Sequence, residues 1–181
     1  MRVIAGSLKG RRLKTPDWDG LRPTSDKLRE TLFNILAPRI AGARVLDAFA
    51  GTGALGIEAL SRGAAWVTFI EEDRRAQALI EANLAQCRID TGYTVLRAST
   101  ARAADQLRGQ TPFDIVLMDP PYDVPPGPAL ADMASLVAAS GIVVFEHSRR
   151  SEVPMEIGQL VRVRQVISGD SVLSLYELRA R

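Results

Sequence analysis

Apolar residues recur along this chain in two alternating patterns, short continuous runs and longer stretches with helical spacing. Short apolar runs favour buried strands, whereas apolar positions three and four residues apart favour amphipathic helices. Alternation of the two is typical of a parallel sheet with helices on both faces. The pattern predicts strands at 44–49, 66–71, 93–97, 113–118 and 141–146, and helices at 54–62, 73–86, 100–108 and 129–139.

The two ends of the chain depart from this alternation. Residues 159–167 and 171–178 read as two strands joined by Ser168-Gly169-Asp170, a connection so tight that the strands must pair antiparallel. We therefore predict an α/β fold with a mostly parallel seven-stranded sheet, a C-terminal antiparallel hairpin, and ligands bound over the carboxyl ends of the strands.

The first 38 residues are predicted to form a small basic hairpin and a helix. Residues 2–5 and 11–13 alternate as two short strands that turn at Lys9-Gly10. Thr24 or Ser25 is placed to cap the helix, and Pro38 is expected to end it. We therefore divide the chain into an extension at 1–38 and one main domain at 39–181.

A glycine-rich turn follows the first predicted strand of the main domain. Gly51, Gly53 and Gly56 fit the spacing GxGxxG, and Glu71 lies 20 residues after Gly51 at the end of the next strand. This spacing does not separate NAD from other adenosine-bearing cofactors, because each needs close backbone approach and a carboxylate for the ribose hydroxyls. Asp47, at the mouth of the loop, favours a cationic ligand over a pyrophosphate.

The sequence Asp119-Pro120-Pro121-Tyr122 ends the fourth predicted strand. Each proline lacks an N–H but keeps its carbonyl, so the loop presents acceptors and few donors. If the Asp119 carboxylate and the Pro120 carbonyl accepted both N–H bonds of a nucleobase amine, its nitrogen would become more tetrahedral and its lone pair could attack a methyl group. Tyr122 would stack on the base. Taken alone, the four residues are equally typical of a Pro-rich turn that closes a strand.

Composition and charge narrow the class of protein. A chain of 181 residues with 46% hydrophobic content is typical of one globular domain. No apolar run approaches the roughly 20 residues of a membrane helix, so we expect a soluble cytoplasmic protein without membrane contact. Cys87 and His147 are the only residues of their kinds, which disfavours a disulfide, a metal site or a Ser/His/Asp triad. Cys87 is expected to be a core residue at a helix end.

Positive charge is concentrated near the N-terminus. The net charge is +2, but residues 1–30 carry eight Lys or Arg against four Asp or Glu. A basic segment outside the catalytic fold is typical of contact with a phosphate backbone, although short basic stretches also occur on ordinary solvated surfaces.

Three motifs in this order, each at a predicted strand end, resemble the S-adenosylmethionine-dependent methyltransferases that modify exocyclic amines: Asp47-Ala-Phe-Ala-Gly-Thr-Gly, Glu71 and Asp119-Pro-Pro-Tyr. Two further segments look like the RsmD family, Arg2-Val-Ile-Ala-Gly-Ser-Leu-Lys-Gly-Arg-Arg-Leu and Leu21-Arg-Pro-Thr-Ser-Asp-Lys-Leu-Arg-Glu-Thr-Leu-Phe-Asn-Ile-Leu. The resemblance covers residues 2 to about 148. It implies a Rossmann-like class I methyltransferase fold and methyl transfer from S-adenosylmethionine to N2 of a guanine in 16S ribosomal RNA.

The resemblance implies roles for the site residues. Glu71 would bind the ribose hydroxyls, with Glu72 and Asp73 as close rivals, and Asp47 would lie near the ammonium or sulfonium of the cofactor. Ser99 is a weak candidate for the adenine contact. The predicted catalytic residues are Asp119, Pro120, Pro121 and Tyr122, and the predicted cofactor-binding residues are Asp47, Phe49, Gly51, Thr52, Gly53, Glu71, Glu72 and Ser99.

A structured RNA loop is the expected substrate, because a base is flipped out of a loop more easily than out of a helix. The resemblance implies 16S RNA within an assembling small subunit, and nothing in the sequence demands more than a monomer. Arg22 and Arg29 could instead brace the catalytic loop. The predicted RNA contacts are Arg2, Lys9, Arg11, Arg12, Lys14, Arg22, Lys27 and Arg29.

Four alternatives stay open from the sequence. A DNA adenine-N6 methyltransferase shares the Asp-Pro-Pro-Tyr loop but usually carries a target-recognition segment for which this chain has little room. A glutamine-N5 protein methyltransferase characteristically has Asn at position 119. An NAD-dependent oxidoreductase leaves the Asp-Pro-Pro-Tyr loop unexplained, and a non-catalytic RNA-binding protein explains the basic segment alone.

Overall fold

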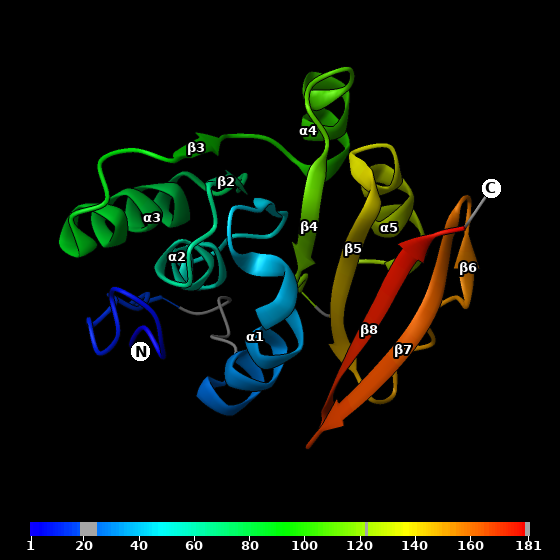
Figure 1. Ribbon diagram of the computed structural model, residues 1–181, viewed down its shortest axis with the longest axis horizontal. Coiled ribbons are helices and arrows are strands. Elements are labelled where there is room, and N and C mark those ends of the chain that lie inside the picture. Colours follow the sequence, from blue (N-terminus) through cyan, green and yellow to red (C-terminus); the bar gives the residue numbers. More distant parts are fainter. Residues whose placement is uncertain (19–24, 122, 180–181) are drawn as a thin grey trace.

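The computed structural model describes residues 1–18, 25–121 and 123–179. Within these residues the chain forms five helices and one eight-stranded sheet of order β3-β2-β1-β4-β5-β8-β7-β6 (Figure 1). The strands are β1 (Arg44–Asp47), β2 (Trp66–Ile70), β3 (Tyr93–Leu96), β4 (Phe113–Met118), β5 (Val137–Ser148), β6 (Glu156–Ile157), β7 (Leu160–Ser168) and β8 (Ser171–Leu178). The helices are α1 (Asp26–Ile40), α2 (Ala54–Ser61), α3 (Arg74–Cys87), α4 (Thr100–Leu107) and α5 (Pro126–Ala134).

The sheet has the predicted mixture of directions. Strands β1 to β5 run parallel, and β8 pairs antiparallel with both β5 and β7. The β7–β8 hairpin turns at Gly169, whose φ of 63° lies in the left-handed region. The predicted parallel sheet with a C-terminal antiparallel hairpin is confirmed, and the two-residue β6 is a strand that the sequence pattern did not predict.

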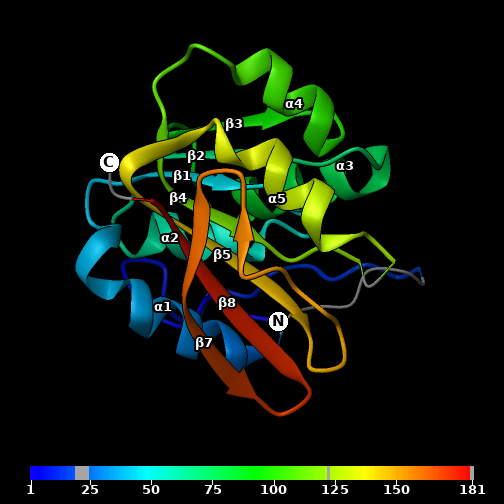
Figure 2. The same cartoon turned by 90° about the vertical axis from the view of Figure 1, so that its right-hand side faces the viewer.

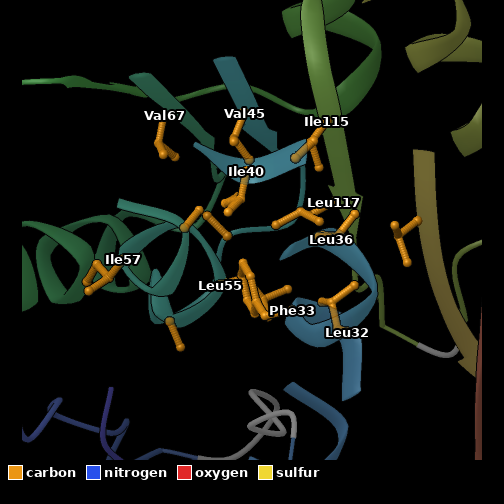
Figure 3. Packing of buried hydrophobic residues seen from close by; sticks show 14 of the residues in the cluster. Leu32, Phe33, Leu36, Ile40, Val45, Leu55, Ile57, Val67, Ile115 and Leu117 are labelled. Carbon is orange, nitrogen blue, oxygen red and sulfur yellow. The ribbon is translucent and has the colours of Figure 1, made fainter. Parts of the chain in front are cut away.

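Helices cover both faces of the sheet and bury two apolar clusters. One cluster joins α1, α2 and α3 to the sheet, and the other joins α4 and α5 to its opposite face (Figure 2). Figure 3 shows Leu36 and Ile40 of α1 directed toward Val45 and Leu117 of β1 and β4. Cys87 is buried at the end of α3, as predicted. Among the described residues, no helix is both long and apolar enough to cross a membrane.

Two predicted helix ends were wrong. Helix α1 contains Pro38 and continues to Ile40, because the buried side chain of Ile40 packs in the core and holds the last turn. Helix α5 ends at Ala134 instead of extending to 139. The residues after it join β5, where Val137 pairs with Phe113. Long-range strand pairing therefore overrides the helical spacing of these residues.

The N-terminal segment is attached to the main domain rather than standing apart from it. The predicted hairpin is reduced to one antiparallel bridge between Arg2 and Arg12. The buried carboxylate of Glu58 on α2 accepts the backbone N–H groups of Ile4 and Ala5 at 2.7 and 3.0 Å. Val3 lies in the same apolar cluster as residues of α1 and α2, so apolar packing also holds this segment against the main domain.

Packing between α2 and β2 generates a stability prediction. A Cβ at position 56 would lie 2.2 Å from Cε1 and 2.7 Å from Cζ of buried Phe69. We expect Gly56→Ala to lower the free energy of unfolding by about 1–3 kcal/mol, because this overlap outweighs the better helix propensity of alanine. In a Phe69→Leu background the cost should shrink, since leucine lacks the outer ring atoms. Urea unfolding of the wild type, Gly56→Ala, Phe69→Leu and the double variant measures the cost of Gly56→Ala in each background. Equal costs in the two backgrounds would contradict this packing account.

Candidate active site

A cavity of about 850 Å³ lies over the carboxyl ends of the parallel strands. This is the edge at which ligands bind in open α/β sheets. One part of the cavity lies beside the glycine turn and the ends of β2 and β3. The other part lies beside the end of β5, the N-terminus of α1 and the tip of the β7–β8 hairpin. Asp119, directly after β4, lines the cavity between these parts.

The glycine turn between β1 and α2 is held by the carboxylate of Glu71. Oε2 of Glu71 accepts the N–H of Gly51 at 2.9 Å, and Oε1 accepts the N–H of Asp73 at 2.8 Å. Gly51 and Gly53 have φ values of 53° and 76°, which strain other residues, so glycine is needed for the turn. Thr52 and Gly53 complete the turn but are not among the described residues that line the cavity; Gly53 precedes the first residue of α2, and the Thr52 carbonyl accepts a hydrogen bond from buried Asn83.

Asp47 lies behind the glycine turn, fully buried. Its Oδ2 accepts the N–H of Gly56 at 2.9 Å, so the carboxyl satisfies one of the free N–H groups of the first turn of α2. Burial is the main reason that the pKa of Asp47 is raised to about 7; the hydrogen bond from Gly56 lowers this pKa, and the nearby carboxylates of Asp119 and Glu71 each raise it by a smaller amount. Asp47 is buried behind the cavity wall, and its predicted place near the cofactor cation stays a prediction.

Other predicted cofactor residues do line the cavity. Phe49 and Gly51 contribute to it from the glycine turn, and Glu71 and Glu72 from the end of β2. Each Glu71 oxygen has two lone pairs, so the backbone contacts leave capacity for ribose hydroxyls. Ser99 also lines the cavity, but its hydroxyl accepts the N–H of Arg102 at 3.5 Å as the cap of α4.

The loop after β4 forms the wall between the two parts of the cavity. Asp119, Pro120 and Pro121 all line it, as the sequence predicted for a site at this strand end. Val124 continues the wall, with its N–H bonded to the Pro121 carbonyl at 3.0 Å. The predicted stacking residue, Tyr122, lies outside the described residues.

The charge of the cavity wall limits which ligand it can hold. Of the described residues that line it, six are acidic and one, Arg75, is basic. Such a wall repels the pyrophosphate of NAD and attracts a cationic ligand. A group that carries an ammonium and a sulfonium next to a ribose therefore fits this site. Among the described residues, no three His, Cys, Asp or Glu side chains gather closely enough to bind a metal ion.

The basic residues predicted to contact RNA are not equally available. Arg29 is fully buried and donates to the backbone carbonyl of Arg2 and to Asp26, each at 2.7 Å. Its predicted contact with RNA is therefore wrong, and it holds α1 against the N-terminal segment instead. Arg22 lies outside the described residues. The remaining predicted contacts are exposed: Arg2, Lys9, Arg11, Arg12, Lys14 and Lys27.

The sequence did not predict several residues that line the cavity. Glu146 lies in β5, directly after the apolar run that ends at Phe145, so the rule that selected Glu71 and Asp119 at strand ends would also have found it. Ser168 and Asp170 reach the cavity through the β7–β8 hairpin, and no local signal in the sequence reveals this.

The N-terminal segment also reaches the cavity. Trp18 lines it, and the guanidinium of Arg75 lies 5.0 Å from the centre of the Trp18 ring. This cation–π contact joins the end of the segment to α3 at the cavity. The basic surface and the candidate active site are therefore physically connected.

Comparison with known proteins places this arrangement in a family. The family model described as conserved hypothetical protein 95 matches residues 1–177. Ribosomal RNA small subunit methyltransferase D of Escherichia coli K12 is 49% identical over 122 residues, which cover 67% of this chain and 60% of that relative. The YlbH protein of Bacillus subtilis is 38% identical over 183 residues, which cover 99% of this chain and 100% of that relative. The solved structure of the Escherichia coli yhhF protein has a TM-score of 0.82 at 36% identity, covering 100% of this chain and 99% of that one.

The raised pKa of Asp47 generates a prediction about pH. The folded protein keeps a proton on Asp47 that the unfolded chain releases near its ordinary pKa of 3.8, so between about pH 4 and pH 7 the folded state binds more protons. The free energy of unfolding should therefore fall as pH rises through this window, by about 1.4 kcal/mol per unit from this group, and level off above pH 7.

The variant Asp47→Asn should remove this contribution, because its amide oxygen still accepts the N–H of Gly56 but does not titrate. Urea unfolding at several pH values from 4.5 to 8 would compare the two proteins. Their difference in unfolding free energy should change with pH; two parallel curves would show that Asp47 titrates normally.

Proposed function

This chain belongs to the family described as conserved hypothetical protein 95, and we propose that it transfers a methyl group from S-adenosylmethionine to the N2 amine of a guanine in 16S ribosomal RNA. One observation carries the proposal: the glycine turn, Glu71 and the Asp119–Pro121 loop line a single acidic cavity. The similarity to ribosomal RNA small subunit methyltransferase D supports the substrate class.

The part of the cavity beside the glycine turn would hold the cofactor. Glu71 and Glu72 would accept the ribose hydroxyls, and the Gly51 backbone would support the methionine portion. Asp47 acts from behind the turn, where its carboxyl accepts the N–H of Gly56 and holds the start of α2. When bound, S-adenosylmethionine supplies an electrophilic methyl group on a positively charged sulfur.

The loop after β4 would orient the amine that receives the methyl group. The Asp119 carboxylate and the Pro120 carbonyl accept its two N–H bonds, which draws the nitrogen lone pair out of conjugation with the ring. Asp119 also stabilises the positive charge that develops on this nitrogen, and it can take the proton that leaves after transfer. Tyr122 would stack on the flipped base. Most of the rate enhancement would come from holding the amine against the methyl group.

The exposed basic residues of the N-terminal segment would bind the RNA. Arg11 and Arg12 lie on the same docked segment as Trp18, which lines the cavity, so contacts to phosphates could bring a base to Asp119. The small area of this segment favours an assembling small subunit over naked RNA as substrate. We further propose that the protein acts as a monomer in the cytoplasm.

Methyl transfer to small subunits taken from cells that lack this protein would test the function. With labelled S-adenosylmethionine, the wild-type protein should place the label in N2-methylguanosine of 16S RNA. The variant Asp119→Ala should lower kcat by about a thousandfold, because the amine loses its orienting acceptor, while the Kd for S-adenosylhomocysteine stays within about threefold.

Asp90→Ala removes an exposed carboxylate outside the cavity and should match the wild type. Label in N6-methyladenine or in protein would refute the guanine assignment. Equal loss of transfer and of cofactor binding in Asp119→Ala would show that the loop supports the fold rather than the reaction.

The role of the basic segment predicts a change in salt dependence. In the double variant Arg11→Ala/Arg12→Ala, RNA binding should weaken, and the slope of log K against log salt should flatten by about 1.4 to 1.8, because two phosphate contacts are lost. The exposed pair Arg108→Ala/Arg164→Ala, directly after α4 and on β7, is the matched control for charge. Filter binding across a salt series measures each slope, and equal slopes in the two double variants would exclude the segment from RNA binding.

A further inference from the structure

Glu146 stands beside Asp119 at the carboxyl end of the sheet. Met118, the last residue of β4, pairs with Phe145 of β5; Asp119 directly follows Met118, and Glu146 follows Phe145 within β5. Neighbouring strands lie about 4.8 Å apart, so the two side chains leave the backbone at similar positions along the sheet edge. Both residues line the same cavity.

The two carboxylates also point to the same face of the sheet. Leu117 and Val144 both belong to the cluster packed under α1. Side chains two residues apart on a strand share a face, so Asp119 and Glu146 are directed toward the N-terminus of α1. There Leu28 lines the same part of the cavity, on the far side from the glycine turn. This part can hold a flipped base beside Asp119.

Guanine differs from the other bases in the atom beside its exocyclic amine. Its N2 amine is adjacent to N1–H, a donor, whereas the amines of adenine and cytosine have ring nitrogens beside them that only accept. An ionised carboxylate only accepts hydrogen bonds. A second carboxylate beside the amine-binding Asp119 therefore matches guanine and opposes adenine and cytosine.

We propose that Glu146 is the residue that selects guanine, by accepting its N1–H while Asp119 and Pro120 accept the N2 amine. The proposal rests on the proposed function and adds to it the source of base specificity. The loop after β4 is suited to any exocyclic amine, so the choice between guanine and adenine needs a group elsewhere in the cavity. The carboxylate of Glu146, one strand away, supplies that group.

The test uses 2-aminopurine, which keeps the N2 amine but has an acceptor at N1 and no O6. Small subunits are assembled from 16S RNA that carries guanine or 2-aminopurine at the position where N2-methylguanosine maps in the wild-type product. The wild-type protein should prefer guanine by about a hundredfold or more in kcat/KM, because 2-aminopurine leaves the carboxylate opposite an acceptor.

Glu146→Gln should change this preference. The glutamine amide can donate to N1 of 2-aminopurine, so kcat/KM for 2-aminopurine should rise about tenfold; its oxygen can still accept N1–H of guanine but carries no charge, so kcat/KM for guanine should fall only about tenfold. The lost O6 affects both proteins alike and cancels when their preferences are compared. The Kd for S-adenosylhomocysteine should stay within about threefold of the wild-type value.

Glu152→Gln is the matched control, because Glu152 is an exposed carboxylate that does not line the cavity. It should keep the wild-type preference. An equal fall for both purines in Glu146→Gln would show that Glu146 only supports the fold and would overturn the proposal. If the wild-type product is not N2-methylguanosine, the proposed function itself is wrong. If the product is N2-methylguanosine but Glu146→Gln keeps the wild-type preference for guanine, only the proposed role of Glu146 is wrong.

Discussion

The site depends on two carboxylates that hold the glycine turn between β1 and α2. Glu71 binds the N–H of Gly51 from the end of β2, and Asp47 binds the N–H of Gly56 from the end of β1. These bonds fix the backbone where the cofactor must approach. The acidic residues that line the cavity place negative charge at the same strand ends. Burial is the main cause of the raised pKa of Asp47; the carboxylates of Asp119 and Glu71 add to it, and they also make the cavity suited to a cation. The carboxylates at this edge of the sheet therefore have two roles: they hold the glycine turn, and they attract a cationic cofactor.

The N-terminal segment carries the proposed RNA contacts and is bonded to the rest of the protein through its backbone. Buried Glu58 on α2 and buried Asn83 on α3 bond to its backbone, and buried Arg29 bonds to the carbonyl of Arg2. Using backbone groups for attachment leaves basic side chains such as Arg11 exposed. The backbone bonds therefore hold the proposed phosphate contacts of this segment in a fixed position relative to the cavity.

Asp119 links the two halves of the proposed reaction. The parallel sheet brings the ends of β1, β2, β4 and β5 to one edge, so a cofactor and a base can meet at the loop after β4. The antiparallel β7–β8 hairpin then extends past β5, and its tip completes the wall on the side of the base. In the proposed reaction, the parallel strands hold the cofactor, and the C-terminal hairpin and α1 line the part of the cavity that would receive the base.

The sequence by itself determined the order of the elements, the glycine turn and the Asp119 loop, because these follow from local periodicity and from the backbone properties of glycine and proline. It also determined that Glu71 and Asp119 would meet, since parallel strands share one edge. Only the tertiary structure decided that Asp47 and Arg29 are buried and that Ser168 and Asp170 line the cavity. Whether a side chain is buried or lines the cavity depends on strand register and on contacts between residues far apart in the chain, which local sequence patterns do not specify.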